Sequence, residues 1–144
     1  MTSSDQWQNN WRAVAAPGAV RIDLRRDGAA ADRHASGSRL ESGDDVVIGA
    51  SAPGAARRSR RFAAESGVHI DRVYLAFPSA AAPAYLVEDS AAAIAAFSRS
   101  VLVAPPRARF ALPIEAALLV VRRLRLWWLV RMLAPGRLAV GRKL

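Results

Sequence analysis

The chain has 144 residues, a length that corresponds to one domain, and it contains no cysteine. The absence of cysteine excludes a disulfide scaffold and any metal site built from thiolates, and it favours a cytoplasmic protein. The formal net charge is +9, and the segment 105–144 carries +8 of it, with nine Lys and Arg residues against one acid, Glu115. The basic character is therefore concentrated in the last part of the chain.

Residues 1–44 are expected to form a flexible, largely disordered N-terminal arm. Residues 1–10 are polar and show no basic region followed by an apolar one, so we expect no secretory signal. Residues 25–45 mix charges, Gly and Ser with almost no large apolar residue. Between these stretches, residues 19–24 (AVRIDL) alternate in polarity, which predicts one short strand.

Residues 45–104 predict a β-α-β-loop-α unit. The run DVVIGAS is typical of a buried strand, and a turn with Ser51 as the candidate N-cap leads into a helix that ends at Gly67. Residues 68–77 (VHIDRVYLAF) predict a second strand, with a bulge where the apolar alternation shifts phase. After a proline-bracketed loop, residues 84–87 suit a short extended segment. The acids and Ser90 that follow precede a helix that stops before Pro105.

Residues 105–144 predict a basic, apolar helix and a final strand. The helix is expected over 111–134, and the strand over 137–142 (RLAVGR) after a Pro-Gly turn. The predicted fold class is therefore α/β, a partial Rossmann-like segment of order β-α-β-loop-α-long α-β behind the N-terminal arm.

Three stretches, VVIGASAPG, VYLAFPS and LAPGRLAVGRKL, resemble the C-terminal part of the class I S-adenosylmethionine-dependent methyltransferases. In that family a strand, a helix, a strand and a variable insert are followed by a final antiparallel strand. The resemblance covers residues 45–144 and implies the same order of elements here.

The resemblance also implies what this chain lacks. The family holds its cofactor with a Gly-rich loop after the first strand and with an acidic residue at the end of the second. Neither feature precedes Asp45, and 44 residues are too few for the missing units at about thirty residues per βαβ unit. We therefore expect a methyltransferase-like fragment that is not catalytic alone and binds no cofactor, unless a partner supplies the S-adenosylmethionine-binding half.

A strand-to-helix turn is the candidate anion site. Backbone N–H groups at such a turn favour an anion, and the candidate residues are Ser51, Gly54, Arg57 and Arg58. The turn lacks both the GxGxxG and the Walker patterns, so an ordinary turn beside a solvated arginine face is the favoured alternative.

The sequence gives little support for metal binding, acid-base catalysis or a serine nucleophile. The two histidines, His34 and His69, have no second ligand at HxH or HxxxH spacing, so no metal site is predicted. The acid pair at residues 88–89 suits a helix start better than acid-base catalysis, and no serine lies in a GxSxG motif. We therefore predict no catalytic residue.

The predicted helix over 111–134 is long enough to cross a bilayer core of about 30 Å. Arg122, Arg123 and Arg125 argue against crossing, because each would cost roughly 2.5–3.5 kcal/mol at the bilayer centre. Surface attachment fits better, with basic and aromatic residues at the level of the lipid headgroups. The candidate contact residues are Arg122, Arg123, Arg125, Trp127, Trp128 and Arg131.

The expected partner is thus an anionic membrane surface or a hydrophobic protein. A core helix whose arginines extend outward to water explains the same pattern equally well. A basic segment with aromatics also suits nucleic acid, but the density of Leu and Val disfavours that alternative.

Overall fold

The computed structural model describes residues 7–26, 30–33, 40–101 and 111–144. The chain divides into two compact units, unit 1 (Met1–Leu86 with Ala134–Leu144) and unit 2 (Val87–Leu133). These boundaries differ from the expected ones at residues 45 and 105, because the last strand returns to the unit that contains the first. His34 lies outside the described residues.

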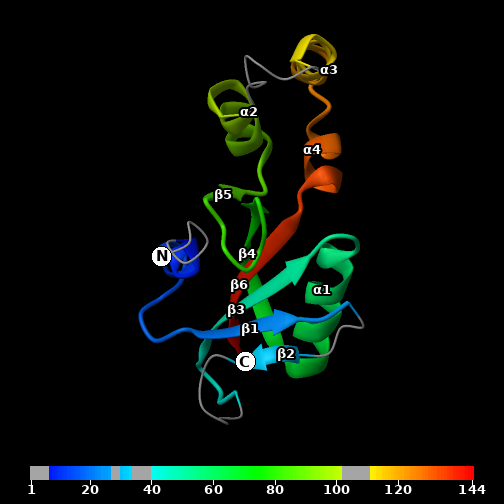
Figure 1. The fold of residues 1–144 in the computed structure, drawn as a ribbon. Coiled ribbons are helices and arrows are strands. Elements are labelled where there is room, and N and C mark those ends of the chain that lie inside the picture. Colours follow the sequence, from blue (N-terminus) through cyan, green and yellow to red (C-terminus); the bar gives the residue numbers. More distant parts are fainter. Residues whose placement is uncertain (1–6, 27–29, 34–39, 102–110) are drawn as a thin grey trace. The chain divides into compact units, whose positions relative to one another are not determined.

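The fold is mixed α/β, as predicted, and is built on a six-stranded sheet of order β2-β1-β3-β6-β4-β5 (Figure 1). The strands are β1 (Val20–Leu24), β2 (Ala30–Arg33), β3 (Asp45–Ser51), β4 (Val68–Phe77), β5 (Tyr85–Glu88) and β6 (Gly136–Lys143). The helices are the 3-10 helix η2 (Asn10–Ala13) and the α-helices α1 (Ala55–Ser66), α2 (Ala91–Ser100), α3 (Ala111–Arg123) and α4 (Trp127–Leu133).

The final strand β6 lies inside the sheet. It pairs antiparallel with both β3 and β4, while β1 and β3 are parallel neighbours. The predicted bulge is present, because the register between β4 and β6 shifts between Ile70 and Arg72. Gly141 faces this region, and a Cβ at that position would come within 1.9 Å of the carbonyl oxygen of His69. Only glycine allows β4 and β6 to approach this closely.

Helix α1 covers one face of the sheet. Its buried residues, Ala55, Ser59 and Ala63, are spaced at i, i+4 and i+8 and therefore share one side of the helix. The core beneath it includes Ile22, Val46 and Ile48. The helix ends at Gly67 in the left-handed conformation, φ 65°, as the sequence predicts.

The opposite face of the sheet carries a second core cluster around Trp11, with Val47 and Leu138 among its buried members. Trp11 comes from η2, and β1 lies between β2 and β3. Much of the segment expected to be a disordered arm is therefore part of the folded unit 1. The alternating polarity of residues 19–24 predicts a strand but not its neighbours, so the sequence does not show that this strand lies inside the sheet.

In unit 2, helix α2 begins as predicted, with the Ser90 hydroxyl accepting a hydrogen bond of 3.2 Å from the amide of Ala93. The single long helix expected over 111–134 is wrong, because α3 ends at Arg123 and α4 begins at Trp127. The amide of Leu126 bonds the Val121 carbonyl, and the amide of Arg125 bonds the Arg122 carbonyl. This is a Schellman ending, in which Arg125 takes the left-handed conformation (φ 52°) that glycine usually occupies.

Candidate functional site

The arginines expected to contact a membrane or a partner divide into two kinds. Arg122 donates from Nη2 to the carbonyl oxygen of Ser98, and Arg131 forms an ion pair with Asp89, with 2.5 Å between Nε and Oδ1. Both bonds lie within unit 2 and join α3 or α4 to the segment around α2. Arg122 and Arg131 therefore hold this unit together.

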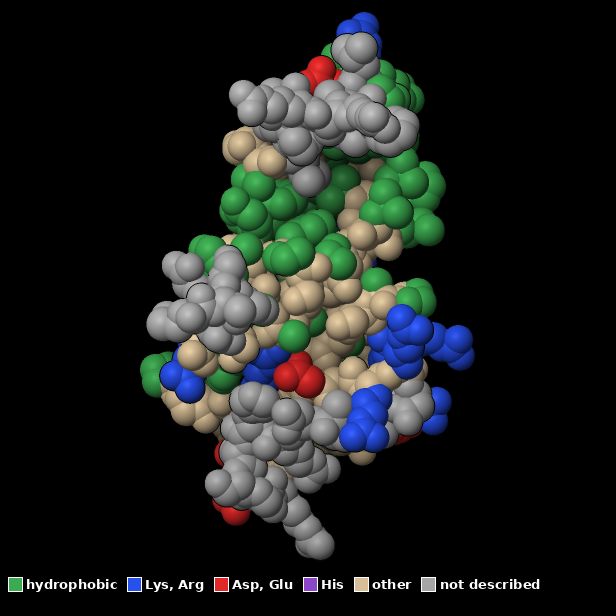
Figure 2. All heavy atoms as spheres, in the orientation of Figure 1, with side chains coloured by type: hydrophobic (Ala, Val, Ile, Leu, Met, Phe, Trp, Pro, Cys, Tyr) green, Lys and Arg blue, Asp and Glu red, His purple; other side chains and the backbone are tan. Residues whose placement is uncertain are grey.

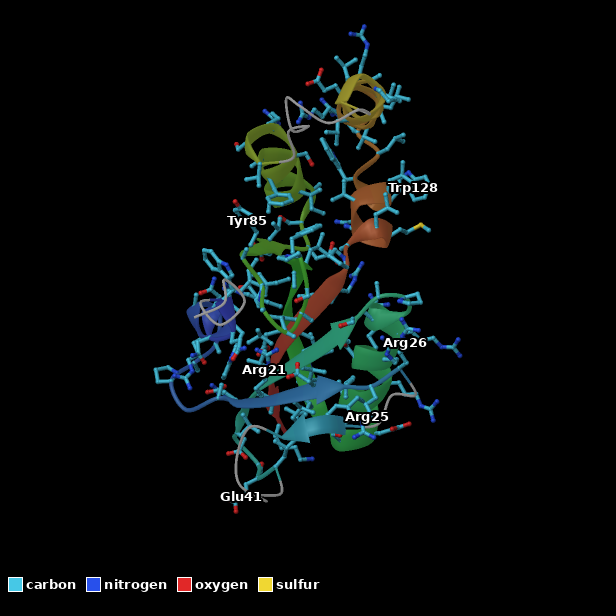
Figure 3. All side chains as sticks on the ribbon, in the orientation of Figure 1. Arg21, Arg25, Arg26, Glu41, Tyr85 and Trp128 are labelled. Carbon is cyan, nitrogen blue, oxygen red and sulfur yellow. The ribbon has the colours of Figure 1, made fainter. Side chains whose placement is uncertain are left out.

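Arg123 and Arg125 are different. Both are exposed, and their side chains have no acid or hydrogen-bond partner in the part of the chain that the structure describes. Their charges are thus available to an external anion. The Trp pair divides in the same way, since Trp127 is partly buried and Trp128 is 53% exposed. Figure 3 shows Trp128 pointing outward from α4.

Large apolar side chains are exposed on the same two helices and on the turn between them. Leu124 is 61% exposed, Met132 70% and Leu133 77%. We define the α3–α4 patch as Leu119, Val120, Arg123, Leu124, Arg125, Trp128, Met132 and Leu133. In the orientation of Figure 2, hydrophobic side chains gather over α2 and α4. Scattered apolar residues are normal on a protein surface, whereas a set gathered on two consecutive helices and their connecting turn is a candidate interaction surface.

The candidate anion site at the β3–α1 turn is closed by its own arginine. The guanidinium of Arg58 donates to the carbonyl oxygens of Ser51 and Pro53. The N-cap of α1 is Gly54, with φ 76° and no side-chain hydrogen bond, rather than Ser51 as predicted. Arg57 is exposed. This geometry fits the favoured ordinary-turn alternative, because the turn carbonyls already accept hydrogen bonds from a cation at the candidate anion position.

The remaining described candidates are His69 and the acid pair at residues 88–89. His69 is 66% exposed and lies 3.8 Å from Asp71, and no group of three metal-ligating side chains occurs within the described ranges. Asp89 bonds Arg131, while Ser90 caps α2. The capping role predicted for the acid pair therefore falls to Ser90 alone, because Glu88 is the last residue of β5 and Asp89 is engaged by Arg131.

A charge cluster on the second face of the sheet was not predicted from the sequence. Arg21 is 3% exposed and forms an ion pair of 3.0 Å with Asp23. It also donates to the carbonyl oxygen of Ala80 at 2.9 Å, and its guanidinium carbon lies 5.5 Å from the ring centre of Trp11. The signal was the opposite charges at i and i+2 of β1, which place both side chains on one face. In the sequence, these two charges cannot be told from those of an exposed strand face, because no local pattern shows that Trp11 packs beside them.

Asp23 lines a cavity of about 210 Å³ at the carboxyl ends of the parallel strands β1 and β3. Gly49 makes room for the carboxylate, since a Cβ there would lie 2.1 Å from its Oδ1. Ligands of open α/β sheets bind at this end of the strands. Arg21 already neutralises Asp23, so the geometry offers a hydrogen-bond acceptor rather than a free base.

No helix within the described ranges has the length and apolar character needed to cross a membrane. The chain matches no protein-family model, no curated protein and no solved structure.

Proposed function

We propose that this chain is a non-catalytic, methyltransferase-like α/β protein that attaches to anionic membrane surfaces from the cytoplasmic side through the α3–α4 patch. The observation that carries the proposal is the combination, on α3, α4 and the turn between them, of exposed Leu, Met and Trp side chains with two arginines whose side chains have no partner among the described residues. A protein surface that mixes large apolar groups with free cations suits the boundary between lipid headgroups and acyl chains.

The energetics favour lipid over water for this patch. A Leu, Met or Trp side chain that passes fully from water into an apolar medium gains about 1.5–3 kcal/mol. Leu124, Trp128 and Leu133 are each more than half exposed, so each can contribute a large part of that gain. Arg123 and Arg125 each add about 1 kcal/mol at an anionic surface. Attachment therefore depends on both apolar insertion and charge.

The element order supports the methyltransferase-like part of the proposal. β3, α1 and β4 run strand, helix, strand, and β6 is a final antiparallel strand after the insert α2–α4. The described residues before β3 include no Gly-rich loop that follows a strand. Accordingly, we expect a calorimetric titration of S-adenosylmethionine into this chain to show no binding.

Vesicle flotation tests the membrane proposal. We expect the wild-type chain to float with vesicles containing phosphatidylserine and to float weakly with phosphatidylcholine vesicles. Arg123→Glu with Arg125→Glu removes about 2 kcal/mol of attraction, which corresponds to roughly thirtyfold weaker partitioning, and adds repulsion.

The matched control reverses the charge of two exposed arginines of α1, Arg57→Glu with Arg60→Glu. It changes the net charge by the same amount, but the two residues belong to unit 1. We expect this control to float like the wild type. Equal loss in both variants would mean that only net charge matters and would contradict the assignment to the α3–α4 patch. A wild-type chain that floats with neither vesicle would point instead to a hydrophobic protein partner.

A further inference from the structure

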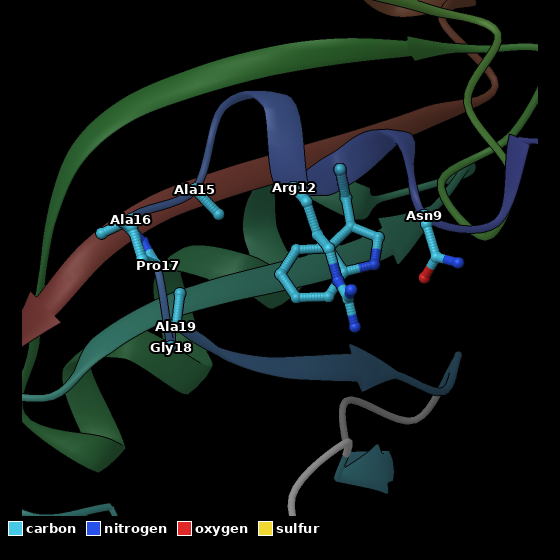
Figure 4. A pocket seen from close by; sticks show the side chains of 8 residues that line it. Asn9, Arg12, Ala15, Ala16, Pro17, Gly18 and Ala19 are labelled. Carbon is cyan, nitrogen blue, oxygen red and sulfur yellow. The ribbon is translucent and has the colours of Figure 1, made fainter.

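A second cavity, of about 550 Å³, lies in unit 1 between η2 and the turn that leads into β1. Figure 4 shows small residues, Ala15 to Ala19, along one side of it, with Arg12 and Asn9 toward the other. A volume of this size falls within the range of roughly 300–1,000 Å³ that holds small organic ligands.

The apolar wall of the cavity is firmly supported. Trp11 is 7% exposed and packs in the core cluster with Val47 and Leu138. Two guanidinium groups lie near its ring, with the carbon of Arg12 at 5.6 Å and that of Arg21 at 5.5 Å from the ring centre. Cations at this distance are attracted to an aromatic ring and favour its packed position.

A hydrogen bond and a glycine define the conformation of the turn at residues 16–19, which lines the cavity. The amide of Ala19 bonds the carbonyl of Ala16 at 3.1 Å, and Gly18 takes φ 83°, which an L-residue rarely adopts. The side chains here are alanines and one proline, so the wall is apolar and leaves space open.

The two cations beside Trp11 differ in charge balance. Arg21 is buried and neutralised by Asp23. Arg12 is exposed and lines the cavity, and it has no acidic or hydrogen-bond partner for its side chain among the residues with described positions. Its guanidinium presents several N–H donors in a fork that matches a carboxylate. The amide side chain of Asn9 lines the same cavity and adds a further donor.

We propose that this cavity binds a small amphipathic carboxylate, with its apolar part against Trp11 and the alanines and its carboxylate on Arg12. The site is separate from the α3–α4 patch and does not depend on membrane attachment. Arg12 supplies the charge recognition, and the small side chains of the turn determine the size of the apolar group that fits.

A matched set of probes tests this assignment by ¹H–¹⁵N NMR of the full chain. Benzoate, benzamide and benzylamine share a ring and differ in the charge of their head group. We expect benzoate to shift the amides of residues 9–19 and the indole N–H of Trp11 saturably, and the other two to bind at least about tenfold more weakly. Equal binding of benzamide, or shifts scattered over the chain, would overturn the proposal.

Two variants locate the site. Arg12→Gln keeps a polar side chain at an exposed position and should weaken benzoate binding at least about tenfold, whereas the control Arg57→Gln on α1 should leave it unchanged. Ala16→Phe, also at an exposed position, should fill the cavity and abolish binding while the other amide signals stay in place. Benzoate binding that survives Ala16→Phe would refute the assignment to this cavity, even if Arg12→Gln failed to fold.

Discussion

Replacing Arg21 with methionine should strongly destabilise unit 1. The guanidinium is 3% exposed and neutralises Asp23, whose side chain is 26% exposed. Breaking a buried ion pair from one side costs about 3–5 kcal/mol, because the remaining charge is left without compensation. Water reaches part of Asp23, so we expect a loss of about 2–4 kcal/mol in the free energy of unfolding. Part of this comes from the lost contacts with Ala80 and Trp11.

A double-mutant cycle with Asp23→Asn separates these contributions. Each single variant should lower stability, and the double variant should be less destabilised than the sum, by about 1–3 kcal/mol, since neither charge is then left alone. Hydrogen exchange at the amides of β1 and β3 measures the free energy of opening for this unit separately from unit 2. A loss below about 0.5 kcal/mol for Arg21→Met, within the range of ordinary surface changes, would refute the cluster's structural role.

Three further substitutions test local features. Gly141→Ala places a Cβ within 1.9 Å of the carbonyl oxygen of His69, so pairing between β4 and β6 must shift, and we expect a loss of about 2 kcal/mol or more, seen as a lower Tm. Ser90→Ala removes the hydroxyl bonded to Ala93 and should cost about 1 kcal/mol, with faster amide exchange confined to α2; unchanged exchange would contradict the cap. Arg125→Gly relieves the strain of the left-handed conformation between α3 and α4. We expect the free energy of opening of α3, measured by amide exchange, to rise by up to about 1 kcal/mol. Faster exchange in α3 would contradict this account.

Local residue chemistry predicted the β3-α1-β4 unit well. Alternating or β-branched runs marked the strands, and Gly67 marked the end of the helix because only glycine takes φ 65° at no steric cost. The order of strands in the sheet could not be predicted in this way. β6 pairs with Asp45 through Arg142, at 97 residues of separation, and such pairing leaves no local pattern.

The candidate site shows the same limit. The sequence offers Arg122, Arg123, Arg125 and Arg131 alike as contact residues, since spacing gives only their positions along an assumed continuous helix. The left-handed residue Arg125 ends that helix, although neither proline nor glycine stands there to signal it. Once α3 and α4 are separate, the helical wheel of residues 111–134 no longer describes which side chains share a face.

The division among these arginines changes which substitution can test membrane attachment. Reversing the charge of Arg122 would break its bond to Ser98, so weaker flotation could reflect damage to unit 2 rather than lost attraction to lipid. Arg131 carries the same ambiguity through Asp89. Arg123 and Arg125 are free of such bonds among the described residues, and the exposed Leu124 stands between them. Since their charges add nothing visible to the stability of the folded chain, a loss of vesicle binding on their reversal, with unit 2 amide exchange unchanged, measures the interaction with the membrane itself.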